Sequence, residues 1–303
     1  MTTTTKRTGP RVSGVQAGQR LPVLKTYKIH IGGKFPRTES GQCYIARAPD
    51  GSALANMCLS SRKDFREAVV AARGALPRWS ASSAFLRGQI LYRVAEMLEG
   101  RRGQFVAELE AQGSPATEAA AEVDAAIDRL VYYAGWTDKY QQIFSSVNPV
   151  SSSHFNFSVC EPTGVVGLVA PEADGLIGLI SNLAPIIAGG NTCVVLASET
   201  KPLCAVTLAE VLHASDLPGG VVNILTGRRD DLLTHFASHM DVNAMIVCGA
   251  DQATRANVQS TAADNVKRAI FRDGDGWLAP DRQHPYLMLD TQEIKTTWHP
   301  IGN

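Results

Sequence analysis

Thr192-Cys193-Val194-Val195-Leu196 carries no charge and is typical of a strand that is buried on both faces of a sheet. Three more apolar runs of this kind occur along the chain, at 165–170, 221–225 and 244–247. Segments with helical periodicity separate the four runs, at 176–188, 205–212 and 231–237. Strands that alternate with helices favour a parallel sheet covered by helices on both sides. The sequence therefore predicts a doubly wound α/β fold.

The part of the chain before these runs predicts strands followed by helices. Short alternating stretches between 27 and 51 are punctuated by glycine and proline, which suits strands joined by tight turns. We expect three helices after them: one opened by a capping box of Asp64 and Glu67 and ended by Pro77, one from Ser83 to Gly100, and one from about Pro115 to Trp136. At 154–159 apolar residues recur at every second position, which predicts a half-exposed strand.

The composition is that of a globular protein and argues against two classes of partner. The 303 residues are 45% hydrophobic and include 29 basic and 29 acidic side chains, so no net charge attracts nucleic acid. The longest apolar stretch, at 175–188, is interrupted by Asn182 and Pro185 and is shorter than the roughly 20 residues that cross a bilayer. We therefore expect neither a nucleic-acid partner nor a membrane span.

The six cysteines and the N-terminal segment bear on the cellular compartment of the protein. No two of the six cysteines form a C-x-x-C pair, and several lie in apolar runs, as buried reduced thiols do. Because the N-terminus has no apolar signal segment, the sequence favours the cytoplasm. Residues 1–20 are rich in Thr, Gly and Arg, and we interpret them as a disordered basic arm.

Four motifs follow one another in a fixed order: Tyr132-Tyr133-Ala134-Gly135-Trp136, Glu161-Pro162-Thr163-Gly164-Val165-Val166-Gly167, Leu217-Pro218-Gly219-Gly220-Val221-Val222-Asn223 and Asn265-Val266-Lys267-Arg268. In order and spacing they resemble Y-Y-A-G-W, E-P-x-G-V-V-G, L-P-x-G-V-V-N and N-L-K-R of the aldehyde dehydrogenase superfamily. The resemblance implies that 21–276 form the Rossmann-like cofactor-binding domain of that family. It also implies that 147–160 are a β extension used for oligomerisation.

The end of the chain resembles the strand with which family members pair with a neighbouring subunit. The matching residues are Glu293-Ile294-Lys295-Thr296-Thr297-Trp298, and we assign 277–303 to this C-terminal pairing strand. Only 31 residues follow Arg272, fewer than the roughly 50 that a domain needs. We therefore expect the catalytic domain of the family to be absent.

The resemblance implies a cysteine thiolate, an oxyanion donor, a carboxylate base and a nicotinamide cofactor for aldehyde oxidation. The nucleophile belongs downstream of Asn265, but the last cysteine is Cys248. Arg272 stands in the place of the glutamate base, and a guanidinium cannot accept a proton near neutral pH. Ala173 stands in the place of the asparagine of P-W-N-F-P, which donates to the oxyanion. The catalytic positions are therefore degenerate.

The carboxylates next to these positions do not restore the site. Asp273 follows Arg272, and a shift of one residue on a strand points its side chain to the opposite face. Glu172 and Asp174 flank Ala173, and we interpret them as parts of a solvated turn.

The positions that hold the cofactor in the family are eroded as well. Leu196 replaces the lysine of K-P-x-E, which binds the adenosine ribose, whereas Glu199 matches the glutamate. In the element G-S-T-E-V-G, Gly249 is kept, and Ala250 and Thr254 replace the serine and the second glycine. Because a helix N-terminus still favours an anion, we expect at most weak binding of NAD or NADP, through Glu199 and Gly249.

A metal site is not expected. His235 and His239 are four residues apart, a spacing at which two histidines can share a metal on a helix. No third ligand is near them in the sequence, and we interpret them as a surface pair.

Three functions remain open. The first is a non-catalytic homologue, a pseudoenzyme similar to the second copy fused to a catalytic one in one subfamily of aldehyde dehydrogenases. It would be a scaffold or regulatory subunit that pairs with a catalytic aldehyde dehydrogenase or with itself, through exposed strand edges at 155–159 and 293–298. The second is an NAD(P)-dependent oxidoreductase that is active only with a partner. The third is a nucleotide-sensing module.

Overall fold

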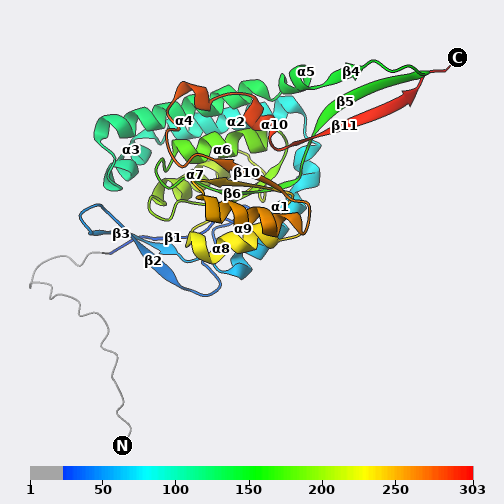
Figure 1. The fold of residues 1–303 in the computed structure, drawn as a ribbon. Helices are drawn as coiled ribbons and strands as arrows, with labels where there is room; N and C mark the ends of the chain where they lie inside the picture. The colour runs from blue at the N-terminus through cyan, green and yellow to red at the C-terminus, as the bar shows by residue number, and fades with distance from the viewer. Residues whose placement is uncertain (1–22, 303) are drawn as a thin grey trace, which may run out of the picture.

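The computed structural model describes residues 23–302, which form a body and a projecting arm (Figure 1). The body is built on one five-stranded parallel sheet in the order β10-β9-β6-β7-β8. Its strands are β6 (Val165–Val169), β7 (Thr192–Leu196), β8 (Val222–Leu225), β9 (Ala244–Cys248) and β10 (Arg268–Arg272). The strand order reverses between β6 and β9, so the predicted doubly wound α/β class is confirmed. The expected basic arm, 1–20, lies outside the described residues.

Helices cover both faces of this sheet. On one face lie α6 (Ile177–Ala188) and α7 (Leu203–His213), with α2 (Ala84–Glu99), α3 (Arg102–Ala111) and α4 (Ala116–Trp136) packed over them. On the other face lie α1 (Arg62–Ser80), α8 (Arg229–Ser238) and α9 (Gln252–Ala263). The strands β6, β7, β8 and β9 are buried at every residue because helices enclose them on both sides. None of the helices within 23–302 is long and apolar enough to cross a membrane.

The four predicted strands are present, and the fifth, β10, was not predicted. Its three apolar residues lie between Arg268 and Arg272, and this sequence with an arginine at each end is not typical of a buried strand. Arg268 donates to the carbonyls of Asp290 and Gln292, and Arg272 pairs with the Asp290 carboxylate at 2.8 Å. Residues distant in the sequence therefore compensate these two charges.

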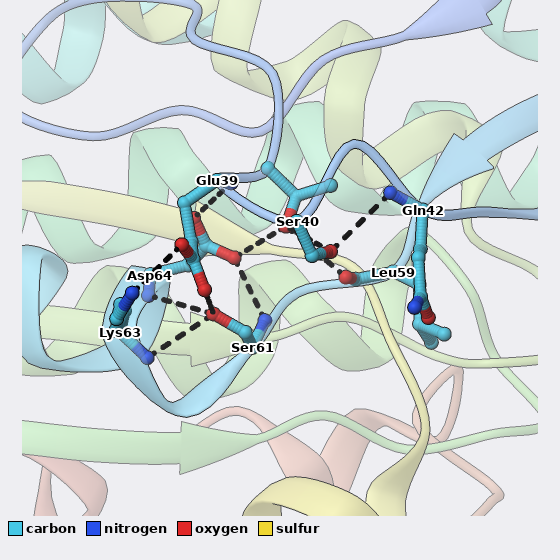
Figure 2. Close-up of polar contacts among 8 residues, drawn as sticks. Glu39, Ser40, Gln42, Leu59, Ser61, Lys63 and Asp64 are labelled. Carbon is cyan, nitrogen blue, oxygen red and sulfur yellow. Dashed lines mark hydrogen bonds and ion pairs between the residues drawn. The ribbon is translucent and has the colours of Figure 1, made fainter.

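Helix α1 begins one turn earlier than predicted. Its N-cap is Ser61, whose N–H donates to the Asp64 carboxylate at 2.7 Å while its hydroxyl accepts from the Asp64 N–H (Figure 2). The same carboxylate accepts from the N–H of Glu39 at 3.1 Å. The expected box of Asp64 and Glu67 is wrong because Asp64 is the third residue of the helix and closes the box, whereas Ser61 is the cap.

Helix α1 also continues through Pro77, where it was expected to end. Its last turn is held by Trp79, which is 1% exposed and donates its indole N–H to the carbonyl of Ile187 at 3.1 Å. This tertiary contact outweighs the local preference of proline. The predicted caps Ser83 and Gly100 of α2 are confirmed, whereas α3 and α5 (Tyr140–Phe144) were not predicted.

The arm is an antiparallel sheet in the order β11-β5-β4 (Figure 1). Its strands are β4 (Ser146–Asn148), β5 (His154–Pro162) and β11 (Gln292–Pro300). The half-exposed strand predicted at 154–159 is thus confirmed. β11 is antiparallel to β5 along its whole length, from Gln292 opposite Pro162 to Pro300 opposite His154. Because β5 lies between β4 and β11, the expectation of a free edge at 155–159 is wrong.

The segment between β10 and β11 is not a strand, although 277–303 were expected to be one pairing strand. It contains the short 3₁₀ helix η1 (Pro280–Arg282) and α10 (Tyr286–Leu289), which packs against α6. A second small sheet, in the order β1-β3-β2, precedes α1. Its strands are β1 (Thr26–Tyr27), β2 (Cys43–Arg47) and β3 (Ala53–Cys58). Of the strands expected between 27 and 51, β2 is confirmed, whereas β1 reaches this range only at Tyr27 and β3 follows it.

Candidate functional site

The carboxyl ends of the parallel strands form the candidate site. In doubly wound sheets, ligands bind outside these ends, where the strand order reverses. In this chain that place lies between the loops after β6 and β9. All six positions predicted from the sequence lie at this edge: Ala173 after β6, Leu196 and Glu199 at and after β7, Gly249 and Thr254 after β9, and Arg272 at the end of β10.

Ala173 and Arg272 occupy the positions of the oxyanion donor and the base. Ala173 is exposed and has no side-chain donor. Arg272 is 8% exposed and donates to the Oδ1 atom of Asn182 at 2.7 Å and to Asp290 at 2.8 Å. The guanidinium therefore joins β10 to α6 and to the end of α10, and it cannot act as a base.

The thiols near this edge are poor nucleophiles. Cys248 ends β9, and burial raises the pKa of its thiol to about 12, although Arg272 and Arg229 oppose the rise. Burial also raises the thiol pKa of Cys58, Cys160, Cys193 and Cys204. The thiolate is the reactive form, so burial makes these thiols less reactive than an exposed cysteine. Cys43 is exposed, but it lies on β2 in the separate small sheet.

Two positions at the end of β7 and in the loop after it bear on a nucleotide. Leu196 is 1% exposed and belongs to the core between the sheet and α1, so it offers nothing to a ribose hydroxyl. The Glu199 carboxylate accepts from the N–H of Arg229, the first residue of α8, at 3.3 Å. The acid that could bind a ribose therefore already has a partner within the chain.

Gly249 and Thr254 also have local roles. Gly249 has φ of +65°, the left-handed region that favours glycine, and a Cβ there would lie 3.1 Å from the Cα of Gly274. Its N–H donates to the carbonyl of Arg272 at 2.9 Å. The N–H of Thr254 donates to Asp251, the N-cap of α9, at 2.8 Å, so the helix N-terminus already holds an anionic group.

Glu172 and Asp174 do not form a solvated turn, contrary to expectation. The Glu172 carboxylate accepts from the hydroxyl of Ser198 at 2.8 Å and from the N–H groups of Glu199 and Thr200 at 2.9 and 3.1 Å. The Asp174 carboxylate accepts from the N–H of Trp277 at 2.9 Å. Sequence reasoning missed both roles because the donors lie in loops far along the chain.

The segment after β10 is anchored by charged residues of α4 that the motifs did not indicate. Arg129, 3% exposed, donates to the hydroxyl of Ser181 at 2.6 Å and to the carbonyls of Trp277 and Arg282 at 3.2 and 3.1 Å. Glu122 accepts from the N–H of Leu176, the N-cap of α6, at 2.9 Å and from that of Ile177, the first residue of α6, at 3.1 Å, and burial raises the pKa of its carboxyl. Their only sequence signal is a charge on an otherwise apolar helical face.

The histidine pair lies apart from this edge. His235 is in α8 and His239 follows it, with its Nδ1 atom accepting from the N–H of Asp241 at 3.2 Å. Across residues 23–302, no three His, Cys, Asp or Glu side chains come together as a metal site.

The residues at the sheet edge do not fit NAD or NADP as they stand. Leu196 lies in the core, Glu199 and Gly249 are bonded within the chain, and the N-terminus of α9 is capped by Asp251. Five cavities of about 280 to 900 Å³ open on the body, and Glu199 and Gly249 line none of these five.

Comparison with known proteins agrees with the resemblance of the motifs. Residues 37–274 match the model of the aldehyde dehydrogenase family. The chain is 31% identical over 266 residues to mouse cytosolic 10-formyltetrahydrofolate dehydrogenase and 30% identical over 265 residues to omega-crystallin of Enteroctopus dofleini. These matches cover 86% and 85% of this chain, but 29% and 52% of the relatives.

Solved structures give the same result. An aldehyde dehydrogenase of Bacillus cereus, solved as an NAD+ complex, superposes with a TM-score of 0.78 and 25% identity. HpcC of Thermus thermophilus superposes with a TM-score of 0.77 and 27% identity. Each comparison covers 82% of this chain, and 51% and 48% of the respective structures. The chain thus spans about half the length, or less, of the relatives that it matches.

Proposed function

Because this chain belongs to the aldehyde dehydrogenase family, we propose that it is a non-catalytic member that acts as a scaffold or regulatory subunit of an aldehyde dehydrogenase assembly. The observation that carries the proposal is the arm, which is fully folded and offers an unpaired strand edge. At the same time, Ala173 has no side-chain donor for an oxyanion, and Arg272 cannot accept a proton in the place of the base. The chain therefore combines a surface for association with a site that lacks the oxyanion donor and the general base of the family.

The free edge belongs to β11. One side of this strand pairs with β5, and no strand among residues 23–302 pairs with the other. Backbone N–H and C=O groups on such an edge can bond to a strand of another chain. At its other side the arm ends in β4, which is only three residues long. The long edge of β11 is the better surface for pairing.

Exposed apolar side chains support the same role. Ile294 and Trp298 of β11 are 52% and 57% exposed, and Phe155 of β5 is 45% exposed. Ile294 and Trp298 share one face of the strand because side chains alternate along it. Phe155 is paired with His299 and therefore lies on the other face. Large exposed apolar groups on a projecting sheet are typical of an interaction site.

The proposed partner is a catalytic aldehyde dehydrogenase or a second copy of this chain. Sheet continuation through backbone groups needs a strand of similar length on the partner, and a member of the same family is the simplest source of one. The six cysteines are free, which is usual in the cytoplasm, and we place the assembly there.

Light scattering tests the proposal. The mass of the purified chain is measured alone and mixed with a catalytic aldehyde dehydrogenase of the same organism. We expect either a mixed complex or a mass of at least twice the 32.5 kDa of one chain. A mass of one chain at every concentration, both alone and in the mixture, contradicts the proposal.

A matched pair of variants locates the contact. Ile294→Lys with Trp298→Lys places two charges on the free strand and is expected to return the chain to a single-chain mass. Met240→Lys removes an apolar side chain that is 72% exposed on the body, and it is expected to leave the mass unchanged. An unchanged mass in the double arm variant would place the contact elsewhere.

Turnover in the mixture separates the scaffold from a partner-dependent enzyme. Under the proposal, the aldehyde oxidation of the mixture comes from the partner alone, so Arg272→Met leaves the rate per partner subunit unchanged. A rate that falls in this variant while the assembly remains intact would favour the enzyme.

A further inference from the structure

We propose that the Glu172 carboxylate is an internal ligand that closes the nucleotide edge of the sheet, so that this chain assembles without NAD or NADP. The inference rests on the proposed function, because it states how a scaffold of this family is made independent of nucleotide. It is carried by the contacts of Glu172 and Glu199.

Four donors hold the Glu172 carboxylate. It lies in the loop after β6 and reaches the neighbouring loop after β7. There it accepts from the N–H groups of Glu199 and Thr200, at 2.9 and 3.1 Å, and from the hydroxyls of Ser198 and Thr200, at 2.8 and 3.0 Å. Hydrogen bonds to a charged acceptor are stronger than neutral ones, so a ligand must compete with all four.

The loop after β7, which the Glu172 carboxylate reaches, is the place where a ribose is bound in doubly wound sheets. In such folds an acidic residue after the second strand accepts from the ribose hydroxyls. β7 is the second strand of this sheet in chain order, and Glu199 follows it. The N–H of Glu199 is bonded to Glu172, and its carboxylate is bonded to the N–H of Arg229. The ribose site is therefore filled by groups of the chain itself.

Charge adds to this exclusion. Glu172 and Glu199 bring two carboxylates to one loop, and a nucleotide carries negative phosphates. Like charges at close range repel, most strongly where water is excluded. The 2′-phosphate of NADP would lie nearest to the ribose acid and would be rejected more strongly than NAD.

Tyr44, on β2 of the small sheet, packs against a cluster that includes Leu203 and Val206 of α7, the helix that follows the loop after β7. Its hydroxyl is buried and has no hydrogen-bond partner within the described part of the chain. Burial raises the pKa of the phenol, and the charges of Glu199 and Glu172 raise it further.

Isothermal titration calorimetry with NAD and NADP tests the proposal on the single chain. No heat is expected for the wild type at millimolar nucleotide. In Glu172→Ala, where four donors are freed and one charge is removed, NAD affinity is expected to rise at least tenfold into the measurable range. Asp174→Asn is the matched control, since it changes a carboxylate of the same loop that binds Trp277, and no gain is expected.

Small carboxylates provide a second readout. Sodium formate, compared with sodium chloride at equal ionic strength, is expected to raise the melting temperature of Glu172→Ala by refilling the four donors, and to leave the wild type unchanged. Glu172→Gln keeps the shape of the side chain and tests the charge alone if the alanine variant does not fold; it too is expected to gain NAD affinity.

Three results overturn the inference: NAD binding by the wild type, no gain of NAD binding in either Glu172 variant, or rescue by formate without any gain for NAD. The mass of the wild type and of Glu172→Ala, measured by light scattering, separates this inference from the proposed function. A failed assembly with the expected calorimetry removes only the scaffold. An intact assembly with unexpected calorimetry removes only the internal ligand.

Discussion

The central sheet and the arm differ in where their side chains point. Every residue of β6, β7 and β9 is buried between helices, whereas β11 is exposed from Ile294 to its end. The sheet therefore stabilises the single chain, and the outer strand of the arm contributes little to that stability. Large apolar side chains that do not stabilise their own chain are available to another one, which is why we locate function in the arm.

The polar groups of the two regions differ in the same sense. At the carboxyl edge of the sheet, the Glu172 carboxylate accepts hydrogen bonds from four donors, and the Glu199 carboxylate accepts one from the first N–H of α8. Along the outer side of β11, the backbone groups have no strand partner within 23–302. The edge that binds cofactor in doubly wound folds is satisfied internally, and the edge that we propose as a contact surface has no strand partner within 23–302.

The largest difference in the free energy of unfolding is expected between alanine variants of two tryptophans, one in the body and one in the arm. Trp79→Ala removes a side chain that is 1% exposed and should lower the free energy of unfolding by about 3–5 kcal/mol. Trp298→Ala removes one that is 57% exposed and should cost less than about 0.5 kcal/mol. Urea unfolding of both variants, at a concentration where the chain is not associated, measures this. Equal losses would break the comparison.

A similar loss is expected when Arg272 is changed to the glutamate of the family. Arg272→Glu places a carboxylate against Asp290 and the Oδ1 atom of Asn182, so the free energy of unfolding should fall by about 3 kcal/mol. Arg93→Met, which breaks an exposed pair with Glu96, should change it by less than about 0.5 kcal/mol. A stable Arg272→Glu variant would show that the guanidinium does not hold the segment after β10.

The next effect is a dependence of the body's stability on pH. Burial, together with the charge of His213, lowers the pKa of His30 to about 4, while the carbonyl of Val222 opposes the shift. The folded chain then stays neutral at this group while the unfolded chain, with an ordinary pKa near 6.5, takes up a proton. Stability is therefore complete above about pH 6.5 and falls on the order of 3 kcal/mol as pH drops to about 4.

His30→Phe tests this dependence. The variant lacks the titrating group, so its urea midpoint should change less than that of the wild type between pH 7 and pH 4.5. Parallel pH curves for the two proteins would show that other groups are responsible.

The smallest effect is expected at the cap of α1. Ser61→Ala removes the hydroxyl that accepts from the first N–H groups of the helix (Figure 2), which should cost about 1 kcal/mol of unfolding free energy. Ser151→Ala changes an exposed residue before β5 and should have no measurable effect. The cap would be unimportant if urea unfolding gave the same midpoint for both variants.

The accuracy of the predictions from sequence also differs between regions of the molecule. β7 is predicted residue for residue, because a strand with both faces buried contains no residue that hides its pattern. β10 is missed because Arg268 and Arg272 are compensated only by residues after it. The helix end at Pro77 is wrong for a related reason, since Trp79 is held by a distant carbonyl.

The candidate site shows the same limit. The motifs align Ala173, Leu196 and Arg272 with functional positions of the family, and the topology brings all three to one edge of the sheet. What the motifs cannot give is the role of Glu172, because its donors at 198–200 lie in another loop and meet it only in the folded chain. Local sequence patterns predict helices and strands well, but they do not predict polar contacts between loops that are distant in the sequence.

Hydrogen–deuterium exchange of the assembled chain tests most directly whether the arm is the contact surface. Exchange is compared between the dilute single chain and the assembly, with or without the catalytic relative. We expect slower exchange at 293–299 of β11 and no change at 198–200, where the donors are already bonded within the chain. Assembly without protection of β11, or with protection confined to the body, would contradict the account.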